Sequence, residues 1–177
     1  GENRAQEMLE KHAALPVDIE WHLIGHLQTN KVKYIAPFVR MIHSVDSLRL
    51  LQEIDRQAAK ANRVIDCLLQ FYIADEATKF GLDETEAREL LSGAEFAAMK
   101  NVRICGVMGM ATFTDDTAQV RAEFRHLKQI FENLKKAFFA ESPHFREISM
   151  GMSGDWRIAV EEGSTMVRIG SLIFGER

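Results

Sequence analysis

The chain has 177 residues, of which 46% are hydrophobic, so it can fold as one domain around a buried core. A formal net charge of −4 at pH 7 argues against a general nucleic-acid binder, because such proteins carry an excess of basic residues. No apolar run approaches the roughly 20 residues that cross a bilayer, and no signal-peptide pattern is visible. Cys67 and Cys105 form no CxxC motif, so we expect buried free thiols in a cytoplasmic protein with no membrane partner.

The first part of the chain alternates between helical and strand-like patterns. Pro16 ends the first helical pattern, since proline lacks the amide hydrogen that a helix interior needs. Asp46 or Ser47 can cap the helix that follows it, and a nearly continuous apolar run indicates a strand covered on both faces. In order, the predicted elements are a helix over 4–15, a strand over 19–27, a helix over 28–39, a strand over 41–45, a helix over 48–62 and a strand over 64–73.

The same alternation continues to the end of the chain. Asp83 and Glu86 have the spacing of a capping box, which marks a helix start. The predicted elements are a helix over 83–99, a strand over 102–110, a helix over 117–139, a strand over 147–152, a helix over 155–162 and a strand over 165–174.

Strand–helix alternation without adjacent hairpins predicts parallel βαβ units. We therefore expect an α/β fold of the TIM (β/α)8-barrel type, with six strands after an opening fragment. An eight-stranded barrel usually takes about 250 residues, so this single domain, residues 1–177, is expected to be N-terminally incomplete. Residues 1–3 resemble the tail of a strand, which would place the first βα unit and most of the second strand upstream. Exposed sheet edges would then favour oligomerisation, although the oligomeric state stays open.

Two segments near the end of the chain share a pattern that suits a phosphate group. Residues 149–155 and 164–171 each form a strand that ends in small residues, and the first runs directly into a helix start. Neighbouring strand ends of this kind offer backbone N–H groups, hydroxyls and a helix N-terminus. A phosphate cradle after the last two strands recurs in (β/α) barrels, so a barrel that handles phosphosugars also fits the pattern.

Several segments form a recognisable series along the chain: GENRAQE (1–7), WHLIGHLQTNK (21–31), IHSVD (42–46), SMGMS (149–153), GSTMVRIG (163–170) and IFG (173–175). In that order they closely resemble the pyridoxal 5′-phosphate (PLP) homeostasis proteins, which are single-domain relatives of the barrel half of bacterial alanine racemases. The resemblance implies a PLP-binding barrel without established catalysis that carries or buffers the vitamin B6 cofactor, with PLP-dependent apo-enzymes as candidate partners.

The resemblance also implies roles for individual residues. Ser153, Gly170 and Ser171 are expected to hold the phosphate, Arg168 to face the pyridine nitrogen, and Asn3 to lie near the ring. A guanidinium beside the ring nitrogen disfavours its protonation and so weakens the ring as an electron sink. This suits a carrier better than a transaminase, although the racemase relatives share the device. The sequence yields no catalytic or metal-binding residue with a comparable signal.

One family feature is missing from the sequence. The family holds PLP covalently on a lysine at the end of the first strand, and none of the chain's lysines has an equivalent context. Lys79 follows a strand and could capture an aldehyde if its pKa were lowered. Asp75 and Glu76 would act against such a shift, so a solvated loop is the simpler interpretation.

Other interpretations remain open. The alternative function is a PLP-dependent racemase-like enzyme, which needs acid and base groups on opposite faces of the substrate carbon, yet neither Tyr34 nor Tyr72 has an evident role as that base. His22 and His26 could suggest a metal pair, but their i,i+4 spacing serves a metal on a helix and not on a strand. His26 could instead line the cofactor's entrance.

Overall fold

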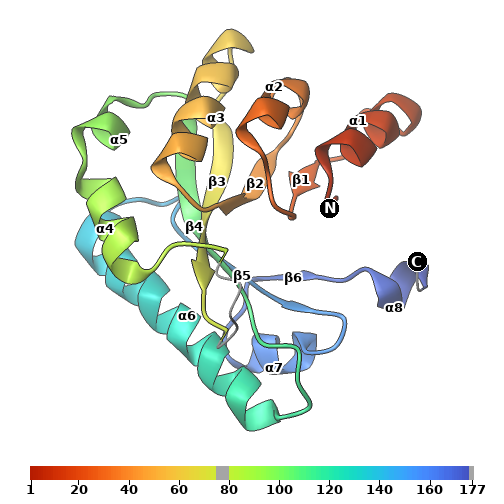
Figure 1. Cartoon of the computed structure of the whole chain (residues 1–177), viewed down its shortest axis with the longest axis vertical. Coiled ribbons are helices and arrows are strands. Elements are labelled where there is room, and N and C mark those ends of the chain that lie inside the picture. The colour runs from red at the N-terminus through yellow and green to blue at the C-terminus, as the bar shows by residue number, and fades with distance from the viewer. Residues whose placement is uncertain (75–79, 176–177) are drawn as a thin grey trace.

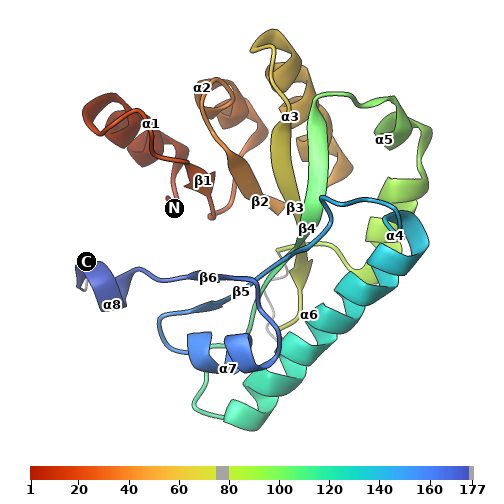
Figure 2. The same ribbon diagram turned by 180° about the vertical axis from the view of Figure 1, so that it is seen from behind.

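The computed structural model describes residues 1–74 and 80–175. One sheet of six parallel strands pairs each strand with the next along the chain, and the helices, except the last one over residues 171–174, cover its outer side (Figures 1 and 2). The fold is therefore an α/β half-barrel. The strands are β1 (His22–Leu23), β2 (Met41–Val45), β3 (Ile65–Tyr72), β4 (Val102–Met110), β5 (Glu147–Met152) and β6 (Met166–Arg168).

The helices begin where the capping signals predict. The Ser47 hydroxyl accepts from Leu50 N, and the Asp83–Glu86 capping box forms in full, which confirms both predictions. None of the described helices is long and apolar enough to cross a membrane. The helical elements are α1 (Ala5–Ala14), η1 (Thr29–Lys31), α2 (Val32–Ile35), α3 (Leu48–Lys60), α4 (Glu84–Ser92), α5 (Ala94–Ala98), α6 (Thr117–Phe138), α7 (Trp156–Glu161) and α8 (Ser171–Phe174).

The strand predicted over 19–27 is largely wrong, because only His22–Leu23 is a strand. Glu2 pairs with Leu23 in a parallel bridge, in which Glu2 N donates to His22 O at 2.9 Å and Glu2 O accepts from Ile24 N at 3.0 Å. Just beyond, Gly25 passes so close to Asn3 that a Cβ would collide with the Asn3 backbone. The chain therefore bends around the opening residues instead of continuing along β2.

Two predicted helices are shorter than their patterns suggest. The helix predicted over 28–39 forms only η1 and α2, because Pro37 lacks the amide hydrogen that would continue the helix beyond Ala36. The helix predicted over 83–99 divides into α4 and α5 at Gly93, whose backbone is extended (φ −72°, ψ 147°).

The last predicted strand, over 165–174, is also wrong in its second half. Strand β6 ends at Arg168, and α8 follows at once. The amides of Ile173 and Phe174 both donate to Gly170 O at 2.9 Å, so this apolar segment forms a helical turn. This turn sets the position of the segment after β6, where the phosphate cradle is expected.

The sheet separates two apolar layers. The larger lies between the sheet and its outer helices, and the smaller lines the inner face with Met41, Leu68, Cys105 and Met108. Cys67 and Cys105 are buried and free, as predicted. Burial raises the pKa of Cys105 to about 11, so its thiol stays protonated and poorly reactive.

Gly106→Ala is expected to destabilise the protein, because Gly106 has a φ of +154° and a Cβ there would collide with Glu147 O on the neighbouring strand. Backbone strain of this kind costs about 1–3 kcal/mol. Urea unfolding should show this loss. The control Gly154→Ala, whose Cβ would meet nothing within 4 Å, should change the free energy of unfolding by less than about 0.5 kcal/mol. Equal stability of the two variants would contradict the argument.

Candidate functional site

A cavity of about 1070 Å³ lies at the carboxyl ends of the strands, where sites form in (β/α) barrels. Its lining combines residues 1–3 with the loop 112–115 after β4 and the segments 152–155 and 166–171 around the ends of β5 and β6. Both ends of the described chain therefore border one space. All five sequence-predicted site residues line it: Asn3, Ser153, Arg168, Gly170 and Ser171.

The segments after β5 and β6 form an open rim of small residues. Gly170 N donates to Ser153 Oγ at 3.3 Å, and this hydrogen bond holds the two segments side by side. A Cβ on Gly154 or Gly170 would meet nothing within 4 Å, so the backbone at these positions faces empty space. Together with the exposed Ser171, the rim offers backbone amides and hydroxyls to an anion, as the sequence pattern suggested.

Arg168 lies at the end of β6 with its side chain partly buried against the sheet. Its Nη1 donates to Ser149 O and Ser149 Oγ, both at 2.8 Å, and its Nη2 donates to Gly109 O at 3.0 Å. Burial lowers its pKa to about 10, so the guanidinium stays charged at pH 7. Within residues 1–74 and 80–175, no carboxylate forms an ion pair with it. Its charge is therefore available to a ligand.

Asn3 reaches the cavity because the residues beside it are fixed in place. The bridge between Glu2 and Leu23 aligns the opening segment with β1, and Gly25 packs against the Asn3 backbone. Lys11, on α1, also lines the cavity and contacts Glu2 Oε1 over 2.6 Å. The opening segment thus forms the wall opposite the small-residue rim.

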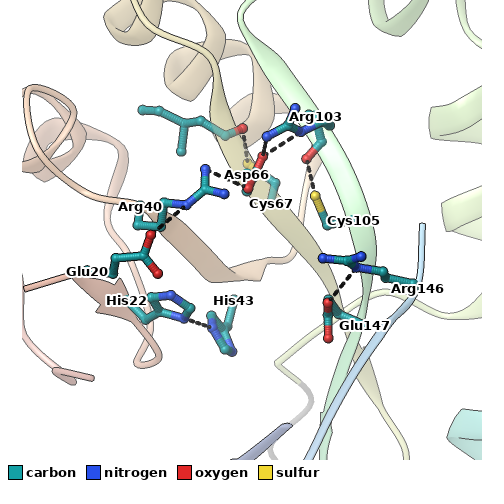
Figure 3. A network of polar contacts seen from close by, with 11 residues as sticks. Glu20, His22, Arg40, His43, Asp66, Cys67, Arg103, Cys105, Arg146 and Glu147 are labelled. Atoms are coloured by element: carbon teal, nitrogen blue, oxygen red, sulfur yellow. Dashed lines mark hydrogen bonds and ion pairs between the residues drawn. The ribbon is translucent and has the colours of Figure 1, made fainter. Parts of the chain in front are cut away.

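Sequence reasoning missed the inward-facing polar residues that connect to Arg168. His22 Nδ1 lies 3.0 Å from His43 Nε2, and His43 Nδ1 lies 2.9 Å from Ser149 Oγ, which also accepts from Arg168. The first of these contacts is drawn in Figure 3. Burial lowers the pKa of His22, and it lowers that of His43 to about 3, so both rings are neutral at pH 7. The available signal was a polar residue inside a buried strand, which must find a hydrogen-bond partner.

A second polar cluster lies near the amino ends of the strands (Figure 3). Asp66, on β3, contacts Arg40 Nη1 at 2.9 Å and Arg103 Nη2 at 2.5 Å, and it is only 3% exposed. A small cavity of about 180 Å³ lies beside this cluster. Arg40 also contacts Glu20, and Arg146 pairs with Glu147, so the acids and arginines of the cluster balance each other's charge.

The remaining candidates from the sequence do not come together as a site. His22 contacts His43, whereas His26 contacts Asp46 at 3.5 Å, so the two do not form a metal pair, and His26 is not part of the cavity lining. Tyr34 is half exposed on α2. Lys79 lies outside the described residues.

Known proteins match this chain along its whole length. The family described as "Alanine racemase, N-terminal domain" matches residues 1–177. The "Pyridoxal phosphate homeostasis protein" of Aquifex aeolicus (strain VF5) is 43% identical over 178 residues, covering 100% of this chain and 76% of that protein. The protein of the same name from Synechocystis sp. is 36% identical and covers 99% and 79%. This chain belongs to the pyridoxal phosphate homeostasis family.

Solved structures agree with the family assignment. PipY of Synechococcus elongatus PCC7942, solved with PLP bound, is 36% identical with a TM-score of 0.83, over 99% of this chain and 80% of that one. An alanine racemase of Clostridium difficile 630 is 15% identical with a TM-score of 0.70, over 99% of this chain and 46% of that one. The second likeness shows the fold alone, and the half-barrel is thus similar to the alanine racemase barrel.

Proposed function

We propose that this chain binds PLP and serves vitamin B6 cofactor homeostasis as a carrier or buffer, with residues 1–177 forming one PLP-binding domain. The observation that carries the proposal is the cavity, which combines an open rim of serines and glycines with a charged guanidinium that forms no ion pair with a carboxylate of the described residues. A phosphate suits the rim, and a neutral ring nitrogen suits the guanidinium.

The chain's own residues fit PLP at both ends of the ligand. Ser153, Gly170 and Ser171 would hold the phosphate, Arg168 would donate to the pyridine nitrogen, and Asn3 would lie near the ring. When bound, PLP supplies an aldehyde that reacts with amines and a ring that withdraws electrons. A permanent charge on Arg168 would disfavour ring protonation and so limit that withdrawal.

A guanidinium beside the ring nitrogen suits a carrier better than a transaminase, but the racemase relatives share this feature, so the enzyme alternative depends on its acid and base groups. Racemisation, the alternative activity, needs acid and base groups on both faces of the substrate carbon. Neither tyrosine lines the cavity: Tyr34 lies on the surface of α2, and Tyr72 is the last residue of β3.

We further propose that the six strands belong to a (β/α)8-type barrel, because β1 and β6, at the two edges of the sheet, border the same cavity. The proposed recipients of the cofactor are PLP-dependent apo-enzymes, because a carrier must release PLP to a protein that uses it. The proposed location is the cytoplasm, where the buried thiols of Cys67 and Cys105 would stay reduced.

Titrating the purified chain with PLP tests the proposed function. We expect a saturable change in PLP absorbance with one ligand per chain, and no conversion of L-alanine to D-alanine by the loaded protein. Transfer of PLP to an apo-enzyme should restore that enzyme's activity. Absence of saturable binding would refute the carrier role, and racemisation would favour the enzyme alternative.

Gly170→Val is expected to weaken PLP binding by about tenfold or more while leaving stability unchanged. The new side chain meets no protein atom near its Cβ, yet it fills the space in which the phosphate would lie. Loss of one or two charge-assisted hydrogen bonds to the phosphate accounts for this effect. Pyridoxal without phosphate is the control ligand, and its affinity should not change. Equal losses for both ligands would contradict the assignment of this rim to the phosphate.

A further inference from the structure

The hydrogen-bond chain that ends on Arg168 links four of the six strands across the inner face of the sheet. Its members come from β1 (His22), β2 (His43), β5 (Ser149) and β6 (Arg168). His43 and Ser149 are 1% and 0% exposed, so water cannot replace a missing partner. The side-chain polar atoms of His43 and Ser149 must therefore be satisfied by their neighbours.

The arrangement fixes which atom donates at each step. Arg168 can only donate, so Ser149 Oγ accepts from it. If His43 Nδ1 also donated to Ser149 Oγ, the serine's own proton would be buried without an acceptor, since the described residues place no other acceptor within reach. A buried donor without a partner is costly, so the Ser149 hydroxyl donates to His43 Nδ1.

The direction of these hydrogen bonds also decides which nitrogen carries the proton in each of the two imidazoles. A neutral His43 that accepts at Nδ1 carries its proton on Nε2, and this proton is donated to His22 Nδ1. His22 then carries its own proton on Nε2. The low pKa of His43, which follows mainly from burial, is consistent with this neutral form. The hydrogen bonds therefore all point the same way: Arg168 donates to Ser149, Ser149 donates to His43, and His43 donates to His22.

We propose that His43 is a positioning residue for Arg168, acting through Ser149: by accepting the serine's proton, it keeps the lone pairs of Ser149 Oγ directed at the guanidinium. The inference rests on the proposed function, in which Arg168 faces the pyridine nitrogen of PLP. Without an acceptor at position 43, the buried hydroxyl must turn to find another partner. Arg168 would then keep only the main-chain carbonyls of Ser149 and Gly109, and its orientation toward the cavity would be less constrained.

The first test needs no ligand. Nitrogen-15 NMR of the histidine rings in the full chain should show neutral His43 with its proton on Nε2 at pH 7. The exposed His126 on α6 serves as the reference for an unconstrained ring. A proton on His43 Nδ1 would overturn the inference even if the protein binds PLP.

The second test compares variants in the PLP-loaded chain. His43→Leu removes the acceptor, and we expect about tenfold weaker PLP binding. The absorbance maximum of bound PLP should also shift toward that of the variant Arg168→Met, in which the guanidinium itself is removed. His43→Asn retains an acceptor near the Nδ1 position and should restore both properties, while the surface control His126→Leu should match the wild type.

The outcomes separate this inference from the proposed function. Equal impairment in His43→Leu and His43→Asn would show that only the bulk of the ring matters and would overturn the positioning role. A wild-type chain that shows the Nε2–H form yet binds no PLP would refute the proposed function and with it any role of His43 toward PLP.

Discussion

Arg168→Met is expected to weaken PLP binding by about 10- to 100-fold. The substitution removes the charge and every donor that the guanidinium presents to the cavity. A hydrogen bond to a charged group contributes about 1.5–3 kcal/mol, which corresponds to this range of affinity. Titration of each protein with PLP, followed by absorbance, measures the loss directly.

Arg168→Lys should bind PLP more weakly than the wild type, because an ammonium cannot keep three hydrogen bonds in the fixed plane of a guanidinium. The matched control is Arg157→Met, which removes an exposed arginine on α7 and should leave the affinity unchanged. Wild-type affinity in Arg168→Met would remove Arg168 from the site, even if the rim after β5 and β6 still bound the phosphate.

The role expected of Arg168 came from the family resemblance, whereas the strands of the sheet were predicted from the sequence pattern. The strands over 41–45, 102–110 and 147–152 were predicted with the bounds that the structure has, since apolar runs bounded by polar or turn residues mark buried parallel strands. The pattern failed at the end of the chain. There Leu172, Ile173 and Phe174 look like a strand but are 63%, 67% and 86% exposed, so the burial that selects a strand is absent.

The rest of the site depends on contacts that no local pattern encodes. Serines and glycines at the ends of strands are visible in the sequence, and parallel pairing brings such ends to one edge of a sheet. His43 and Ser149, by contrast, are 106 positions apart and meet only because the sheet curves until β2 and β5 face one another. The partner of a buried histidine therefore had to come from the three-dimensional structure.

Pairing with the adjacent strands places Asp66 beside two arginines, Arg40 and Arg103, and Asp66→Ala is expected to lower the free energy of unfolding by about 3 kcal/mol. Removal of the carboxylate takes the counter-charge from Arg103 and leaves Arg40 with the exposed Glu20, 3.6 Å away. Breaking a buried ion pair costs about 3–5 kcal/mol, and partial exposure of both arginines places the effect near the lower end. Urea unfolding of the purified chain measures the change.

The control is Glu161→Ala, which removes an exposed acid paired with Arg121 and should leave the stability unchanged. The PLP affinity of Asp66→Ala, measured where the variant is folded, should equal that of the wild type. Asp66 lies near the amino end of β3, whereas the ligand cavity lies at the carboxyl ends of the strands. A loss of affinity without a loss of stability would instead make the cluster around Asp66 part of the binding site, because only a direct effect on the ligand could separate the two measurements in that direction.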